Sequence, residues 1–192
     1  MSNFNPQEIN NLIASRRSVY PKMYSEEKVE DEVIQRMLEN ANWAPTHKFT
    51  EPWRFKVFTG EGLKRLADFQ AERYRIRSGE NFDEKRYQKQ KSSPLKASHV
   101  IAIGMKRNDI IPEIEEIMSV ACAVQNMALT ATAYGVGSYW STGGTTFDEE
   151  AKGFFDLEED DKLLGFLFVG KSEFVGMKGQ RQPIDNKVTW VR

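Results

Sequence analysis

Residues 112–134 are apolar or small on nearly every side when they are wound into a helix. Ile114, Ile117 and Met118 recur on one face, and Val124 and Met127 lie on the opposite face. A helix at the surface of a globular protein usually carries a single apolar stripe, whereas a helix that is apolar nearly all round is buried. The pattern therefore predicts a long central helix that ends at a glycine, around which the rest of the chain packs.

Shorter helical and extended patterns alternate on both sides of this segment. Helices are predicted at residues 5–15, 29–42, 60–78 and 148–155, and strands at residues 52–58, 99–105, 137–141 and 163–169. Asn5 and Asp148 are predicted to cap the helices that follow them. Since strands alternate with helices, residues 1–192 are expected to form a single α/β or α+β domain, with an irregular tail at residues 170–192.

The charge balance argues against several classes of partner. The 192 residues include 27 basic and 28 acidic side chains, a formal net charge of -1, so no general attraction to nucleic acid or to an anionic membrane is expected. The N-terminus lacks the basic and apolar regions of a signal peptide, and the apolar stretches are too short to span a bilayer. We therefore expect a cytoplasmic protein.

The cysteine and histidine content argues against a disulfide scaffold and a metal centre. The chain has one cysteine, Cys122, and two histidines, His47 and His99, which are far apart in the sequence. A single cysteine forms no intrachain disulfide, and no spacing matches a zinc-ligand set. Because Cys122 falls inside the long helix, we predict that it is a core residue rather than a nucleophile.

One literal motif has the wrong context. Residues 165–172 match G-x-x-x-x-G-K-[ST], but the residues between the two glycines are Phe, Leu, Phe and Val, which favour a strand. A P-loop requires a turn between the glycines and a helix after the lysine, and no helical pattern follows here. No G-x-G-x-x-G follows a predicted strand either, so neither a P-loop nor a Rossmann site is expected.

Three other stretches have compositions that suit a ligand. Arg16, Arg17 and Ser18 follow the first helix and can bind a phosphate, although cations at a helix C-terminus are also favourable without any ligand. Residues 44–55 form a rigid connector with prolines and tryptophan, which either fills the core or carries function. Residues 135–144 combine glycines, hydroxyls and a tryptophan; they suit a flat ligand or, alternatively, a helix stop, a strand and a turn.

In this order, the stretches resemble the nitroreductase family of flavin enzymes. The resemblance is carried by Arg16-Arg17-Ser18, Trp43-Ala44-Pro45, Glu51-Pro52-Trp53-Arg54-Phe55, residues 135–142 and the strand at residues 164–170. It covers about residues 8–172 and is closest to the small single-domain branch with Ala-Pro-x-His-Lys in the connector. The resemblance implies an α+β fold in which helices flank a mixed central β-sheet.

The resemblance also implies FMN bound at the interface of a homodimer. The residues implied to contact FMN are Arg16, Arg17 and Ser18 at the phosphate, ribityl chain and ring edge, His47 and Glu51 from the partner subunit, and Trp140, Ser141 and Thr142 along the flavin. The implied activity is two-electron reduction by NADH or NADPH, followed by hydride delivery to a nitroaromatic, a quinone or a related electrophile in a ping-pong cycle. No side chain is assigned as catalytic acid or base.

Two departures from the family pattern keep alternatives open. Glu51 stands where many members have glutamine, and Ser141 stands where the closest branch often has arginine. A flavin-binding carrier or sensor without turnover is therefore a second hypothesis. A third is a specialised reductase of unsaturated or halogenated metabolites, with the charged residues 72–91 as a substrate-selecting lid. Lys178 and Arg181 are candidate counterparts of basic phosphate contacts near the family's C-terminus.

Overall fold

The computed structural model describes residues 4–174 and 179–192. Its helices and strands are α1 (Pro6–Ser15), α2 (Asp31–Ala41), β1 (Trp53–Thr59), α3 (Glu61–Ser78), α4 (Glu84–Ser92), β2 (His99–Met105), α5 (Glu113–Ala133), β3 (Val136–Ser141) and β4 (Lys162–Lys171). Short 3-10 helices are η1 (Pro21–Met23), η2 (His47–Phe49), η3 (Gly79–Asn81), η4 (Pro94–Lys96), η5 (Glu149–Phe155) and η6 (Ile184–Lys187). Each predicted helix and strand is present with bounds within a few residues of those expected, although the short helix after Asp148 is a 3-10 helix.

The four strands form one sheet in the order β1-β2-β4-β3. All three strand pairs are antiparallel, so the expectation of a mixed sheet is wrong for these four strands. The parallel pairing found among the described residues is a single isolated bridge between Ser18 and Ser138. Both β1 and β3 are therefore edge strands of the sheet.

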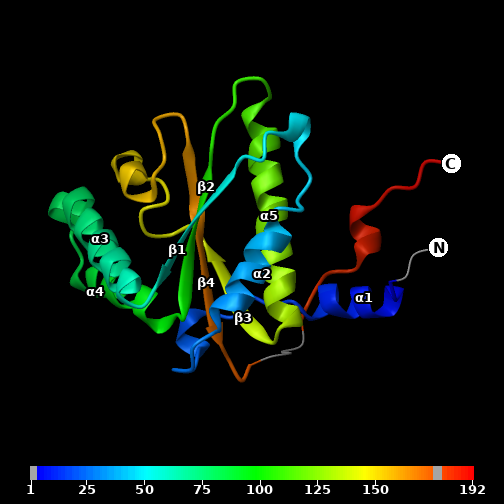
Figure 1. Ribbon diagram of the computed structural model, residues 1–192, viewed down its shortest axis with the longest axis horizontal. Coiled ribbons are helices and arrows are strands. Elements are labelled where there is room, and N and C mark those ends of the chain that lie inside the picture. The colour runs from blue at the N-terminus through cyan, green and yellow to red at the C-terminus, as the bar shows by residue number, and fades with distance from the viewer. Residues whose placement is uncertain (1–3, 175–178) are drawn as a thin grey trace.

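Helices cover both faces of this sheet (Figure 1). Alternate residues of β2 point to opposite sides, so Ile101 and Ile103 pack in a core with α2 and α5, whereas Val100 and Ala102 pack in a second core with α3 and η5. Every residue of β2 is buried as a result, which explains why the strand is apolar from Val100 to Met105 instead of alternating.

The long helix α5 is buried on one side only. Val120 and Met127 are fully buried against the sheet and α2, as expected for a central helix. On another side, Ile114 and Met118 are 55% and 59% exposed. Cys122 shares that side and is exposed, so the prediction of a core cysteine is wrong. The sequence pattern correctly predicted an apolar surface, but residues 4–174 and 179–192 of one chain leave this part of it exposed.

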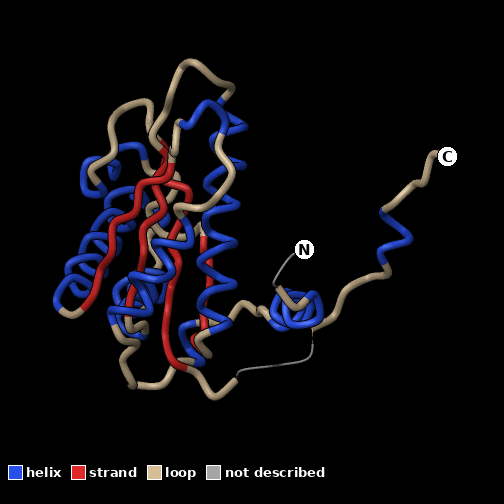
Figure 2. The backbone as a smooth tube through the Cα atoms, turned by 45° about the vertical axis from the view of Figure 1, so that its right-hand side comes forward, coloured by secondary structure: helices blue, strands red, loops and turns tan. Residues whose placement is uncertain are grey.

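The first helix and the C-terminal tail lie outside the layers (Figures 1 and 2). Asn5 caps α1 as predicted, by accepting the N–H of Gln7. No residue of α1 is buried, and its apolar Ile13 is 53% exposed. Trp190 in the tail is 78% exposed. A helix of 10 residues is marginal in water without packing, so its apolar face is available to another surface.

The P-loop-like motif lies in β4, as its residues between the glycines predicted. Its second glycine, Gly170, allows the Tyr24 ring to approach, because a Cβ there would come within 2.5 Å of that ring. Its lysine, Lys171, pairs with Glu30 at 2.8 Å. Burial raises the pKa of the Tyr24 hydroxyl, which donates to the Phe168 carbonyl. The motif therefore has a packing role in this fold.

Candidate functional site

The basic segment predicted after the first helix leaves α1 and runs beside β3. Arg16 has extended backbone angles, φ -57° and ψ 128°, so the helix ends there. Ser18 then forms the isolated parallel bridge with Ser138, and the Val19 N–H donates to the Ser138 carbonyl at 2.9 Å. This bridge brings the segment beside the strand that carries Trp140, a neighbourhood that the sequence separation concealed.

The two arginines of this segment have different surroundings. Arg17 Nη1 donates to the carbonyls of Ala14 and Arg16, both at 2.7 Å, and Gly179 lies against the guanidinium. Arg17 therefore acts as the cation at a helix C-terminus that the alternative interpretation expected. Within the described residues, the half-buried Arg16 side chain makes no hydrogen bond or ion pair. Its five N–H donors are available to an anion.

Trp140, Ser141 and Thr142 lie where β3 runs into a glycine-rich turn. The Trp140 Nε1–H donates to the Leu164 carbonyl at 3.1 Å, and the residue remains 38% exposed. Gly165 has a φ of 126°, and a Cβ there would come within 2.5 Å of the Ser141 carbonyl oxygen. Glycine is required at this position, because β4 approaches the end of β3 so closely.

The turn after Thr142 is anchored to α3 by a buried ion pair. Arg73 donates to both carboxylate oxygens of Asp148, at 2.7 and 2.8 Å, and to Glu150 at 2.8 Å. The hydrogen bond to Asp148, followed by that to Glu150, raises the pKa of the Arg73 guanidinium. Asp148 makes no side-chain cap for η5, so that prediction is wrong: Arg73 takes its carboxylate instead. One residue of the charged segment 72–91 thus holds this turn in place.

The connector with His47 and Glu51 has a strained backbone. Lys48, Phe49 and Glu51 have φ values of 50°, 54° and 43°, which non-glycine residues rarely adopt. The Glu51 N–H donates to Thr46 Oγ1 at 3.1 Å, which helps to hold this conformation. Such residues persist only where surrounding contacts fix them, and they concentrate at functional sites.

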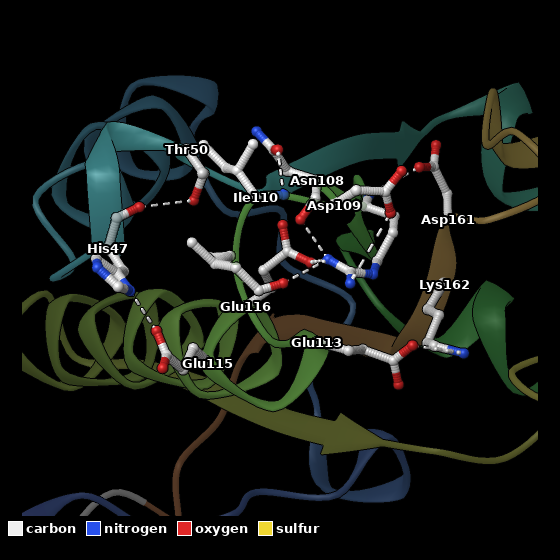
Figure 3. A network of polar contacts seen from close by, with 12 residues as sticks. His47, Thr50, Asn108, Asp109, Ile110, Glu113, Glu115, Glu116, Asp161 and Lys162 are labelled. Carbon is white, nitrogen blue, oxygen red and sulfur yellow. Dashed lines mark hydrogen bonds and ion pairs between the residues drawn. The ribbon is translucent and has the colours of Figure 1, made fainter.

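The imidazole of His47 points at the first turn of α5 (Figure 3). Its Nδ1 lies 2.5 Å from Oε2 of Glu115. The basic segment lies toward the other end of α5, because its bridge partner Ser138 comes directly after that helix. With 21 residues, α5 is about 30 Å long, so the structure separates His47 and Glu51 from residues 16–18 within one chain.

Several residues that contact the candidate site were not predicted from the sequence. Glu115 carries a common signature, an acidic residue in the first turn of a helix, and nothing in the sequence joins it to His47. Arg73 and Asp148 are likewise joined only by the fold. Lys178 lies outside the described residues, and Arg181 donates to the carbonyl of its neighbour Gln180 at 2.7 Å.

The predicted flavin contacts lie on the surface of the single chain, where Ser18 and Thr142 are exposed. Three hollows of about 370, 320 and 160 Å³ lie elsewhere, and the first is lined mainly by residues 21–28 and 95–98. Among the described residues, no group of three His, Cys, Asp or Glu side chains is arranged to hold a metal ion. In the same residues, no helix has the length and apolar character that crossing a membrane requires.

Comparisons with known proteins agree with the architecture. The model of the nitroreductase family matches residues 13–171. The Escherichia coli (strain K12) protein named "Putative NAD(P)H nitroreductase YdjA" is 34% identical over 161 residues, which cover 83% of this chain and 85% of YdjA. The match therefore extends over more than four fifths of each chain.

Solved structures give the same result for the fold. The nitroreductase-like family protein from Bacillus cereus superimposes with a TM-score of 0.80 at 26% identity, covering 100% of this chain and 98% of that one. The FMN-dependent nitroreductase NfnB from Mycobacterium smegmatis, solved in complex with NADPH, has a TM-score of 0.75 at 18% identity and 97% and 99% coverage. The expected α+β nitroreductase-like fold is confirmed, and the chain belongs to the nitroreductase family.

Proposed function

We propose that this chain is an FMN-dependent oxidoreductase that takes electrons from NADH or NADPH and reduces nitroaromatics, quinones or related electrophiles in a ping-pong cycle. The observation that carries the proposal is the parallel bridge between Ser18 and Ser138, which places residues 16–18 beside β3, the strand that leads to Trp140 and the turn after it. Membership of the nitroreductase family supports the assignment, as do the FMN dependence and bound NADPH of the structural neighbour NfnB.

The side chains at this place fit a ligand that has a phosphate and a flat ring. Arg16 offers a guanidinium that no described residue binds, Ser18 offers an exposed hydroxyl, and Trp140 offers an aromatic surface beside a glycine-rich turn. FMN, when bound, supplies the hydride-transfer chemistry. In this proposal Arg16 and Ser18 bind the phosphate, residues 140–142 line the ring, and Arg17 holds the end of α1 in place.

We further propose that a second copy of the chain completes the site. Within one chain, His47 and Glu51 lie away from the basic segment, so they contact the ligand only across an interface. The exposed apolar residues Ile13, Met118 and Trp190, at 53%, 59% and 78% exposure, supply surface for such an interface. A homodimer buries these residues and brings the two halves of the site together.

The first experiment is the visible absorption spectrum of the purified protein after FMN is added and the excess is removed. We expect a retained flavin spectrum, and bleaching of that spectrum by NADH or NADPH without oxygen. Arg16→Ala is expected to weaken FMN binding by roughly 1.5–3 kcal/mol, the range for losing a hydrogen bond to a charged group.

Arg36→Ala is the matched control, since Arg36 pairs with Glu39 on the exposed side of α2. Equal FMN retention in the Arg16 and Arg36 variants would contradict the phosphate role. Flavin that is retained but not bleached by either nucleotide would favour a carrier or sensor. Bleaching without turnover of nitroaromatics or quinones would direct attention to unsaturated or halogenated acceptors.

A further inference from the structure

We propose that Glu115 is the positioning residue of His47: it fixes the tautomer and direction of the imidazole, so that Nε2 is the atom presented across the subunit interface. This inference rests on the proposed shared FMN site. It starts from the 2.5 Å contact between His47 Nδ1 and Glu115 Oε2, which Figure 3 shows from close by. A carboxylate only accepts, so Nδ1 carries the proton and donates it to Glu115. In the neutral ring, the Nε2 lone pair then faces away from α5.

The backbone that carries Glu115 is anchored, because the next residue fixes the first turn of α5. Glu116 is fully buried, and its Oε2 accepts a hydrogen bond from Arg107 Nη1 at 2.6 Å. The same Arg107 nitrogen donates to the Ile111 carbonyl at 3.0 Å, and the Arg107 backbone N–H donates to Asp161 at 2.9 Å. Through these Arg107 contacts, the loop before α5, the first turn of α5 and the residue before β4 are joined next to Glu115.

The His47 side of the contact needs such a restraint. Its side chain is half exposed, and within the described residues Glu115 is the one side chain that bonds its ring. The strained backbone at Lys48, Phe49 and Glu51 fixes where the loop runs, but it leaves the ring free to turn about its side-chain torsions. Glu115 removes that freedom, as an outer partner does for a histidine that has to present one defined nitrogen.

The test is ¹⁵N NMR of the imidazole rings in the FMN-free protein, which has only two histidines. We expect the signature of the Nδ1–H tautomer for His47, and its partial loss in Glu115→Ala. Glu115→Gln keeps an acceptor oxygen and is expected to retain most of that signature. Glu113→Ala is the matched control, because Glu113 lies in the same helical turn and pairs with Lys162 at 3.4 Å. His99, bonded to Asp31 and Ser98, serves as the unchanged internal reference.

FMN affinity then separates this inference from the proposed function. We expect the dissociation constant to rise about 10-fold in Glu115→Ala, as for loss of an outer positioning contact, and to stay within about twofold in Glu113→Ala. If His47→Ala weakens FMN binding but Glu115→Ala changes neither affinity nor tautomer, the positioning role is overturned and the proposed function stands. If Arg16→Ala and His47→Ala both leave FMN binding unchanged, the shared site fails and the positioning role fails with it.

Discussion

Two regions of this molecule treat apolar side chains in opposite ways. The layered body, made of β1–β4 with α2, α3 and α5, buries its apolar residues in a core on each face of the sheet. The open face, made of α1, residues 179–192 and the outward side of α5, leaves residues such as Ile13, Met118 and Trp190 exposed. The apolar residues of the body are buried within one chain. The open face exposes apolar residues of the kind that a core or a protein interface normally buries.

The residues predicted to bind FMN lie where these two regions meet or at their margins. Arg16 and Ser18 join α1 to β3, and His47 contacts the N-terminal turn of α5. A site assembled at such a boundary depends on both regions. Changes in the body should therefore act on stability, and changes on the open face should act on assembly and ligand binding.

The largest effect is expected from Arg107→Met in the body. It leaves the carboxylate of Glu116, which is fully buried, without its charged partner. Removing one partner of a buried ion pair costs about 3–5 kcal/mol, so the free energy of unfolding should fall by that amount in denaturant titrations. Arg36→Met, which breaks the exposed pair with Glu39, should cost about 0–1 kcal/mol. Similar losses in the two variants would contradict this assignment.

Two methionines of α5 allow the same substitution to be compared in the body and on the open face. Met127 is fully buried and Met118 is 59% exposed. Met127→Ala should lower the free energy of unfolding by about 2–5 kcal/mol. Met118→Ala should change it by no more than about 0.5 kcal/mol at dilutions where the chain does not self-associate. If Met118→Ala costs as much as Met127→Ala at high dilution, the outward side of α5 belongs to the body.

Ile13→Ser tests the open face directly. Since Ile13 is 53% exposed and no residue of α1 is buried, the isolated chain should lose no more than about 0.5 kcal/mol of stability. Self-association, measured by sedimentation velocity over a range of protein concentrations, should weaken, and FMN retention should weaken with it. Ile34→Ser, at a residue only 4% exposed in the body, is the contrasting variant and should destabilise the fold itself. Unchanged sedimentation of Ile13→Ser would remove α1 from the proposed interface.

The smallest effect is expected at an exposed ion pair of the body. The hydrogen bond from Lys171 lowers the pKa of the Glu30 carboxyl below its usual value of 4.5. A carboxyl with a lowered pKa in the folded chain stabilises the fold above its unfolded pKa, and this contribution is lost as the pH falls through the folded pKa. Glu30→Gln should therefore be slightly less stable than the parent near pH 7. Urea titrations should show the two converging at acidic pH, as the pH falls below the usual value of 4.5 and through the lowered pKa of Glu30. A difference that persists at low pH would point to packing instead of charge.

Local patterns predicted most of the fold. The Asn5 cap, the bounds of α1 and β2, and the glycine that ends α5 follow from capping, periodicity and backbone preference, which act over a few neighbouring residues. The antiparallel character of the sheet did not follow, because strand partners are chosen across the whole chain. The same holds for Cys122: periodicity reports that a face is apolar, but not whether the same chain covers it.

The candidate site divides in the same way. The residue types at Arg16, Ser18, His47 and Trp140, together with their order, carried the resemblance to the nitroreductase family, and comparison confirmed that family. The partners Arg73–Asp148 and His47–Glu115 are separated by 75 and 68 residues. Patterns among neighbouring residues therefore could not predict that these side chains bind each other.

By itself, then, the sequence determined the helices, the strands, their caps and the family to which the chain belongs, because these depend on short-range periodicity and on residues in a recognisable order. Only the tertiary structure decided that Ser18 lies beside Ser138, that Asp148 binds Arg73 instead of capping η5, and that one side of α5 stays open. The physical reason is that hydrogen bonds, ion pairs and apolar burial act between surfaces in space, and distance along the chain does not encode which surfaces meet.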